Sequence, residues 1–372
     1  MDRTWKSYDF ILGAAVFLLL LMSITTLYGM AAGAVAGSFF LKQLIYVVLG
    51  LGIVVVLTLS DYRHLQKYST PIYFITLAVL VWTLVFGENI RGTSGWLSFG
   101  FFQLQPVEVA KISLTIFLAS FISQKKTDLP VWTRVFASAV MGGIMILLVL
   151  KQPDLGSSLV LFAIWGAIIF ASGLKRHHMA TLFALGLAIV VIAWFLLAPY
   201  QKDRIYNFFA PERDPLGTGY NVIQALVAVG SGGVTGKGLG TGSQSQLNFL
   251  PEKHTDFIYA VISEELGLVG ALTVILLYAL LLYRIYRIGE RAQDNFGYLL
   301  ALGIFMMFLV QITINLGMNM GLLPVTGLTA PFLSYGGSSL LSFFLALGLL
   351  GSISRQRGRT EISSLNLEKS LI

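Results

Sequence analysis

The sequence predicts an all-α, polytopic membrane protein with about ten transmembrane helices and one long extracytoplasmic loop. Of its 372 residues, 56% are hydrophobic and only 12% are charged, whereas soluble domains carry about 25% charged residues. Its apolar stretches reach the length of about 20 residues that a membrane helix needs. They are too evenly apolar for barrel strands, which alternate at every second residue. These observations argue against a soluble, a disordered and a barrel protein.

Ten apolar stretches form the predicted spans, and residues 1–372 are treated as a single membrane domain. Residues 199–253 form the long loop between the seventh and eighth spans, and residues 355–372 form a tail. The spans lie near residues 8–30, 40–60, 71–87, 106–123, 133–150, 155–173, 178–198, 255–284, 297–320 and 330–354.

The orientation follows from lysine and arginine, which are enriched in cytoplasmic loops. If the N-terminus is inside, most of the 25 Lys and Arg residues fall in cytoplasmic segments. The sequence therefore predicts that both termini are cytoplasmic and that loop 199–253 faces outward. Attraction to anionic lipid of the inner leaflet accounts for the formal net charge of +7, so no nucleic acid partner is predicted.

The long loop contains seven glycines between Gly230 and Gly242, after a predicted helical stretch from Tyr220 to Val229. This run is not a nucleotide-binding P-loop, because Lys237 is followed by glycine and not by Ser or Thr. Two interpretations stay open. The run could be a flexible or tightly turning hinge, or its backbone amides could contact a lipid-linked pyrophosphate.

Charged side chains inside or beside the spans are the candidate functional residues, because each costs about 2.5–3.5 kcal/mol at a helix centre. Glu108 and Lys111 open the fourth span and share one helix face, so they could form a structural pair, or Lys111 could contact substrate. Lys151 and Asp154 lie in the outward turn between the fifth and sixth spans. Asp256 begins the eighth span, where it could cap the helix or meet a polar substrate.

Other polar residues favour structural roles. Glu264 and Glu265 lie deeper in the eighth span and are interpreted as hydrogen-bonding groups of the bundle interior. Gln311, Asn315 and Asn319 recur every four residues and predict interhelical hydrogen bonds. With no cysteine and four scattered histidines, the sequence predicts no metal site and no cofactor, and it leaves open whether a divalent cation is needed.

Ordered motifs along nearly the whole chain resemble the SEDS family (shape, elongation, division and sporulation). The sequence of the long loop resembles the elongation branch, the RodA-type proteins, more than the division branch, the FtsW-type proteins. The motifs are Lys151–Gly156 (KQPDLG), Pro211–Tyr220 (PERDPLGTGY), Gly230–Gly233 (GSGG), Gly236–Gly238 (GKG), Gln244–Gln246 (QSQ), Phe249–Phe257 (FLPEKHTDF), Glu264–Gly267 (EELG), Asn315–Asn319 (NLGMN), Pro324–Gly327 (PVTG) and Pro331–Ser339 (PFLSYGGSS).

The resemblance implies a ten-helix polymerase that extends peptidoglycan glycan strands from lipid II, with Asp256 as the catalytic base. Lys111, oriented by Glu108, matches the family's Gln-Pro-x-Glu-x-x-Lys element and is expected to contact the pyrophosphate. The family often has an arginine before Trp96, where this chain has Ser-Gly, so Arg91 is the expected substitute. Further substrate contacts are expected, within these motifs and loops, from Trp96, Lys151, Asp154, Arg213, His254, Ser334 and Ser338.

The resemblance also implies partners and a location. The expected partner is a class B penicillin-binding protein, a transpeptidase of the elongation complex, in the bacterial plasma membrane with the active site on the outer face. Two other function classes stay open. A lipid II flippase would also need a polar cavity in the bundle, and a non-catalytic scaffold of the wall-synthesis complex would not need Asp256.

Overall fold

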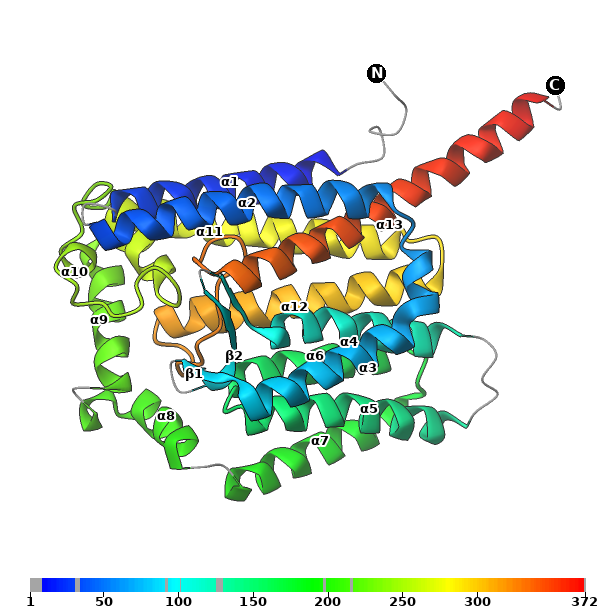
Figure 1. Ribbon diagram of the computed structural model, residues 1–372, viewed down its shortest axis with the longest axis horizontal. Helices are drawn as coiled ribbons and strands as arrows, with labels where there is room; N and C mark the ends of the chain where they lie inside the picture. Colours follow the sequence, from blue (N-terminus) through cyan, green and yellow to red (C-terminus); the bar gives the residue numbers. More distant parts are fainter. Residues whose placement is uncertain are drawn as a thin grey trace.

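Long helices lying side by side form the body of the protein (Figure 1). The structure, a computed structural model, describes residues 9–30, 34–90, 93–100, 102–124, 130–196, 199–214 and 217–370. Within these ranges, eight helices are long and apolar enough to cross a membrane, and Leu155–Phe170 is a shorter apolar helix. The predicted fold class, a helical polytopic membrane protein, is confirmed.

A helix lies over each of the ten predicted spans. In chain order these are α1 (Phe10–Gly29), α2 (Ala34–Leu59), α3 (Arg63–Phe86), α4 (Pro106–Ser123), α5 (Val131–Lys151), α6 (Leu155–Phe170), α7 (Arg176–Leu196), α11 (Ile258–Glu290), α12 (Asn295–Asn319) and α13 (Gly337–Ser370).

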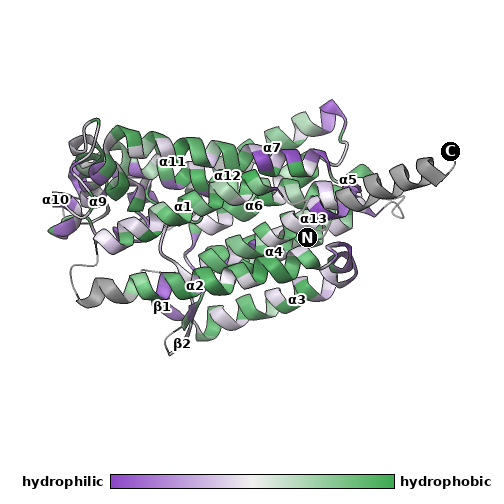
Figure 2. Cartoon of the chain, turned by 90° about the horizontal axis from the view of Figure 1, so that it is seen from above, coloured by the Kyte–Doolittle hydropathy of each residue, from purple (hydrophilic) through white to green (hydrophobic). Residues whose placement is uncertain are grey.

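The two ends of the bundle differ from its body in polarity. Hydrophobic residues dominate the long helices, and hydrophilic residues gather at the two ends (Figure 2). α1 begins and α13 ends at one end, while the strands and the short helices α8, α9 and α10 lie at the other (Figure 1). This arrangement suits a protein whose middle is solvated by lipid.

Helix α4 forms the centre of the bundle together with α12 and α13. In the most apolar window of α4, 83% of the residues are buried, compared with 22% in α2. The less buried helices expose large apolar side chains, for example Val48 on α2 and Leu147 on α5. Polar side chains that sequence analysis placed in the fourth and ninth spans are therefore inside the protein and not in contact with lipid.

A small antiparallel sheet, which the sequence analysis did not predict, joins α3 to α4. Its strands β1 (Glu88–Ile90), β2 (Thr93–Phe99) and β3 (Phe102–Leu104) pair in the order β1-β2-β3. The register places Glu88 opposite Trp96 and Leu97 opposite Leu104. The strands are too short to show a clear alternation in the sequence.

The segment 199–253, which is predicted to face outward and is called the outer segment below, is largely helical. It comprises α8 (Pro199–Phe209), a 3-10 turn (Pro211–Arg213), α9 (Thr218–Ser231) and α10 (Ser243–Gln246). Helix α9 confirms the predicted helical stretch in this loop.

The glycine run packs against an interruption in α11, where Gly267 has φ 65° and ψ −159°. Backbone amides of the run donate to α11, from Lys237 to the Glu264 carbonyl (3.0 Å) and from Gly238 to the Glu265 carbonyl (2.9 Å). In return, the Leu268 amide donates to the Gly233 carbonyl (2.9 Å). These contacts favour neither a flexible hinge nor an anion-binding loop, because the amides are already bonded to carbonyl groups.

The two glutamates of α11 hold the same segment through their side chains. The Glu264 carboxylate accepts hydrogen bonds from Lys237 Nζ (2.9 Å) and from the backbone amides of Gln244 (3.0 Å) and Ser245 (3.2 Å). Glu265 Oε1 accepts from the Gly240 amide at 3.1 Å. Both glutamates are therefore interior hydrogen-bonding groups, as predicted.

Candidate active site

A tight turn places Asp256 directly before α11, at the end of the bundle that carries the outer segment. The backbone amides of Thr255, Asp256 and Phe257 all donate to the Glu252 carbonyl, at 3.1, 3.1 and 3.3 Å. Glu252 itself has a positive φ of 50°, which is uncommon for a residue with a side chain. Three hydrogen bonds to one carbonyl hold this strained turn in place.

Two amides of α12 fix the backbone of Asp256 from the other side. The Asp256 carbonyl accepts from Asn315 Nδ2 (3.1 Å) and Asn319 Nδ2 (2.9 Å). Asn319 Oδ1 also accepts from the Ala260 amide of α11 at 3.0 Å. The predicted interhelical hydrogen bonds are confirmed for these two asparagines, while both polar atoms of the buried Gln311 side chain have no hydrogen-bond partner in the described part of the chain.

The Asp256 carboxylate faces the segment between α12 and α13. A Cβ built on Gly327, whose φ is 79°, would lie 3.7 Å from Asp256 Oδ2. Glycine accepts this backbone conformation without strain, and here it lets the segment pass close to the carboxylate. Asp256 is half-buried, so its carboxylate is held firmly without being sealed inside the protein.

His254 and Ser334 hold the same turn and do not offer free polar groups. The His254 ring stacks on Phe39 with 4.3 Å between centroids, and its carbonyl accepts from the Tyr335 amide at 2.8 Å. The buried Ser334 hydroxyl donates to the Thr255 carbonyl and accepts from the Ala330 amide (2.9 Å). Both predicted site residues lie next to Asp256 along the chain or across the turn, where their contacts are structural.

Ser338 connects the start of α13 to the start of α4. Its hydroxyl donates to the Gln103 carbonyl (2.8 Å) and accepts from the Gln105 amide (3.0 Å). Like Ser334, this serine is buried and bonded to backbone on both sides. The two serines join segments that are more than 70 residues apart, from Thr255 to Ser334 and from Gln103 to Ser338.

Glu108 and Lys111 form a buried ion pair on α4. Lys111 Nζ lies 2.8 Å from Glu108 Oε1, and the exposed fractions of the two side chains are 0% and 5%. Ser342 of α13 donates to the second oxygen of Glu108 at 3.1 Å. The predicted pairing is confirmed, and the geometry favours the structural alternative for Lys111, because its ammonium group reaches no surface.

Asp154 caps α6, and Lys151 lies exposed at the end of α5. Asp154 Oδ1 accepts from the Ser157 amide (2.8 Å), and Oδ2 accepts from Gln105 Nε2 (3.4 Å). A carboxylate at a helix N-terminus is stabilised by the unpaired amides of the first turn. Asp154 is thus part of the joint between α6 and α4.

Trp96 and Arg213 lie in the segments at the end of the bundle that carries Asp256. Trp96 is half-buried on β2, and its indole donates to Thr93 Oγ1 at 3.2 Å. Arg213 is exposed in the 3-10 turn. Arg91 lies outside the described residues.

Comparison with known proteins shows where the chain belongs. Residues 6–359 match the FtsW/RodA/SpoVE family model, which is described as "Cell cycle protein". The chain is a member of this family. Its curated relatives include peptidoglycan glycosyltransferase MrdB of Escherichia coli (strain K12), with 41% identity over 313 residues, covering 84% of each chain.

Solved structures give the same fold. A chain from "Structural coordination of polymerization and crosslinking by a peptidoglycan synthase complex" matches with a TM-score of 0.80 and 31% identity, over 94% of this chain and 98% of that chain. The crystal structure of Rod shape determining protein RodA from Thermus thermophilus matches with a TM-score of 0.71 and 30% identity, over 95% and 98%.

Lys253 is a basic residue of this FtsW/RodA/SpoVE-type site that the sequence analysis did not single out. Its ammonium group donates to the Ser245 carbonyl and to Asn248 Oδ1 (2.9 Å), so it connects the turn before Asp256 to α10. Burial lowers the pKa of Lys253, and the negative charge of Glu265 partly opposes that shift. Its position three residues before Asp256 could have identified Lys253 as a site residue from the sequence alone.

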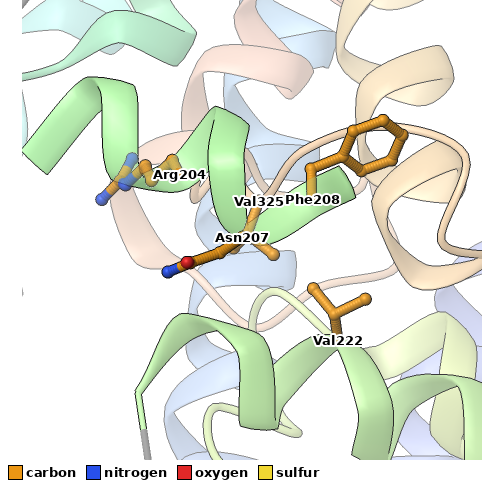
Figure 3. A pocket seen from close by; sticks show the side chains of 5 residues that line it. All are labelled: Arg204, Asn207, Phe208, Val222 and Val325. Carbon is orange, nitrogen blue, oxygen red and sulfur yellow. The ribbon is translucent and has the colours of Figure 1, made fainter. Parts of the chain in front are cut away.

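Two further features bear on the chemistry. Among the described residues, no group of three or more His, Cys, Asp or Glu could hold a metal ion, and the absence of a cofactor stays a prediction. The structure also has a small pocket lined by Arg204, Asn207 and Phe208 of α8, Val222 of α9 and Val325 of the segment before α13 (Figure 3). Sequence analysis missed this pocket, because Val325 is far along the chain from the other four lining residues.

Proposed function

We propose that this family member is a peptidoglycan glycosyltransferase that polymerises glycan strands from lipid II for cell elongation, with Asp256 as the catalytic base. One observation carries the proposal: a half-buried carboxylate is held by its backbone at the end of the bundle opposite the start of α1 and the end of α13. The curated relative with 41% identity is named a peptidoglycan glycosyltransferase.

In the proposed reaction, the Asp256 carboxylate removes the proton from the 4-hydroxyl of the acceptor N-acetylglucosamine. That oxygen forms a bond to C1 of the N-acetylmuramic acid at the end of the donor strand. The bond from C1 to the diphosphate oxygen breaks, and polyprenyl diphosphate leaves with the electron pair, which inverts the configuration at C1. The proton stays on Asp256 until it passes to solvent, and the cycle then repeats.

The fixed backbone around Asp256 suits this role. A general base must lie within hydrogen-bonding reach of the hydroxyl that it deprotonates, and a base on a rigid support keeps that geometry. Asn315 and Asn319 supply the support through the Asp256 carbonyl, and the carboxylate lies beside the segment around Gly327.

The location in the proposal is the bacterial plasma membrane, with both termini cytoplasmic and Asp256 on the outer face. Support comes from the distribution of Lys and Arg, which favours a cytoplasmic position for the end where α1 begins and α13 ends. Lipid-linked substrate would then reach Asp256 from the outer leaflet.

The partner in the proposal is a class B penicillin-binding protein that cross-links the new strand. The solved structure with a TM-score of 0.80 is described as a peptidoglycan synthase complex that coordinates polymerization and crosslinking. A chain of the same fold in such a complex supports the same association here.

The deciding experiment is polymerisation of purified lipid II by the chain with its transpeptidase partner, comparing wild type with Asp256→Asn. Losing a general base lowers the rate by about 10²–10⁴-fold, so the variant is expected to make almost no glycan. Glu212→Gln is the matched control, because Glu212 is an exposed carboxylate in the outer segment. Normal polymerisation by Asp256→Asn would refute the assignment.

The same variants separate the other two function classes. A flippase would still move lipid II across a vesicle bilayer when Asp256 is replaced, and a scaffold would still assemble with its partner and support wall synthesis. Loss of polymerisation with normal assembly therefore supports the enzyme alone.

A further inference from the structure

We propose that Asn315 is a positioning residue of the candidate active site, because its side-chain amide holds the segment around Gly327 at a fixed separation from Asp256. The proposal rests on the proposed function, because it names the residue that aligns the base of that reaction with the chain beside it. Asn315 thereby joins the two segments that meet at the carboxylate.

One nitrogen atom of Asn315 makes both contacts. Asn315 Nδ2 donates to the Asp256 carbonyl at 3.1 Å and to the Leu328 carbonyl at 2.8 Å. An amide nitrogen of this kind carries two hydrogens, so each carbonyl can receive one of them. Because carbonyl oxygens only accept, the amide can serve both segments only with its nitrogen turned toward them.

The contact at Leu328 lies next to the reacting group of the proposed reaction. Leu328 directly follows Gly327, where an added Cβ would lie 3.7 Å from Asp256 Oδ2. Gly327 is exposed and Leu328 is buried, so the segment runs from the surface into the protein beside the base. A displacement of this segment would therefore change the surroundings of the carboxylate directly.

Asn319 differs from Asn315 in the segments that it joins. Asn319 Nδ2 donates to the Asp256 carbonyl (2.9 Å) and to the Asn315 carbonyl of its own helix (2.8 Å). Its Oδ1 accepts from the Ala260 amide of α11 at 3.0 Å. Asn319 thus holds Asp256 and α11 to α12, whereas Asn315 also holds the segment on the far side of the carboxylate.

Two further connections join the same segments at the residues that precede the base. The Ser334 hydroxyl donates to the Thr255 carbonyl and accepts from the Ala330 amide. The Tyr335 amide donates to the His254 carbonyl at 2.8 Å. These connections keep the segments together when the contact at the base itself is lost, so a variant without the α12 amide is expected to fold.

Burial makes the contact at the base firm. Asn315 is 0% exposed and Leu328 is 3% exposed, so water does not compete for the two carbonyls. A hydrogen bond in such surroundings is electrostatically stronger than one in water, and a buried carbonyl without a partner is unfavourable. Without the amide, the two carbonyls are expected to move toward other donors, and a displacement of about 1 Å at a reacting group can lower the rate by about 100-fold.

The test compares kcat and KM for polymerisation of lipid II among wild type, Asn315→Leu and Gln311→Met, each with its transpeptidase partner. In Asn315→Leu, kcat should fall by about 100-fold, and KM should change little because the amide contacts protein backbone and not substrate. Gln311→Met is the matched control, because Gln311 is a buried amide one turn deeper in α12 without a hydrogen-bond partner in the described part of the chain. It should leave both constants unchanged. Asn315→Ser removes the same contacts without added volume, and it replaces Asn315→Leu if that variant does not fold.

Hydrogen exchange measures the joint between the two segments without reference to glycan synthesis. In Asn315→Leu, the backbone amides of residues 326–330 should exchange faster than in wild type, because local opening becomes easier. Gln311→Met should exchange as wild type does. Size-exclusion profiles and melting temperatures verify that each variant is folded. Equal exchange in Asn315→Leu and wild type would overturn the proposal, because the segment would then be held without Asn315.

Combination with Asp256→Asn tests whether Asn315 acts through the base. The rate that remains in Asp256→Asn, measured over long incubations, should change by less than about twofold when Asn315→Leu is added, because the carboxylate to be positioned is already absent. Equal fold losses in the two backgrounds would overturn the proposal, as would an equal loss of kcat in Gln311→Met.

The two readouts separate this proposal from the proposed function. Faster exchange in Asn315→Leu, with a wild-type chain that makes no glycan, would refute the function and leave Asn315 assigned as the joint between the two segments. Normal polymerisation by both wild type and Asn315→Leu would refute the positioning role and leave the function standing.

Discussion

Replacing Gly232 with alanine should destabilise the protein by forcing α9 away from α11. Gly232 ends α9 with a φ of −72°, so alanine can adopt its backbone conformation. The obstacle is space: a Cβ at this position would lie 1.9 Å from the Ser263 carbonyl oxygen and 3.1 Å from Glu264 Cα. Both atoms belong to backbone, which cannot rotate out of the way.

The size of the effect follows from the movement required. Cβ atoms essentially never approach a neighbour closer than 3.0 Å, so the two backbones must separate by about 1 Å, and overpacking of this kind costs about 1–3 kcal/mol. The same separation would lengthen the hydrogen bond from the Lys237 amide to the Glu264 carbonyl, which is now 3.0 Å. The expected loss of stability is therefore at the upper part of that range.

Gly230→Ala is the matched control. Gly230 lies in the same helix, two residues earlier, and is exposed, and a Cβ added there would have no neighbouring atom within 4 Å. Alanine is favoured over glycine inside a helix by about 0.5–1 kcal/mol, so this variant should be slightly more stable than wild type. Opposite signs for the two substitutions are the central expectation.

The assay is the free energy of unfolding in detergent micelles, with glycan polymerisation measured in parallel. A Gly232→Ala protein as stable as Gly230→Ala would refute the reasoning, because it would mean that the outer segment moves freely relative to α11. Loss of activity with unchanged stability would instead indicate a gating role for the glycine run.

The remaining predictions concern the buried polar groups. Lys111→Met should lower the free energy of unfolding by about 3–5 kcal/mol, since it leaves a buried carboxylate unpaired. The double variant Glu108→Gln, Lys111→Met should lower the free energy of unfolding much less, and equal losses of stability in the two variants would contradict the pairing role. Asn319→Leu removes a donor to the Asp256 carbonyl and the acceptor of the Ala260 amide, so it should cost about 1–3 kcal/mol and lower kcat more than it raises KM. An unchanged kcat would show that Asp256 needs no support from α12.

The membrane spans and their polar pairs could be predicted because each is recognised from a short stretch of sequence. An apolar run of sufficient length identifies itself as a membrane helix, and Glu108 and Lys111 reveal their pairing by a spacing of three residues. The amides at Asn315 and Asn319 are likewise visible as one face of a helix. In each case the information lies within one or two helical turns of sequence.

Contacts between distant segments could not be predicted in the same way. From the sequence, Gly232 is expected to be a flexible residue. Its close approach to Ser263 depends on how α9 packs against α11. Ser334 and Ser338 were expected to touch substrate because they lie in a motif that resembles the family pattern. Their hydroxyls are bonded to the backbone of Thr255 and Gln103, contacts that no local spacing reveals, and the substrate contacts stay a prediction.

The arrangement around Asp256 has a consequence for repeated glycan addition. The turn before α11 is held by the Glu252 carbonyl, by Ser334 and by two asparagines of α12, so we expect Asp256 to keep one position through each cycle of the proposed reaction. In the proposed reaction the growing strand must then move past a fixed carboxylate after every addition. A base on a rigid support meets each new acceptor hydroxyl in the same geometry, which repeated addition by the proposed reaction requires.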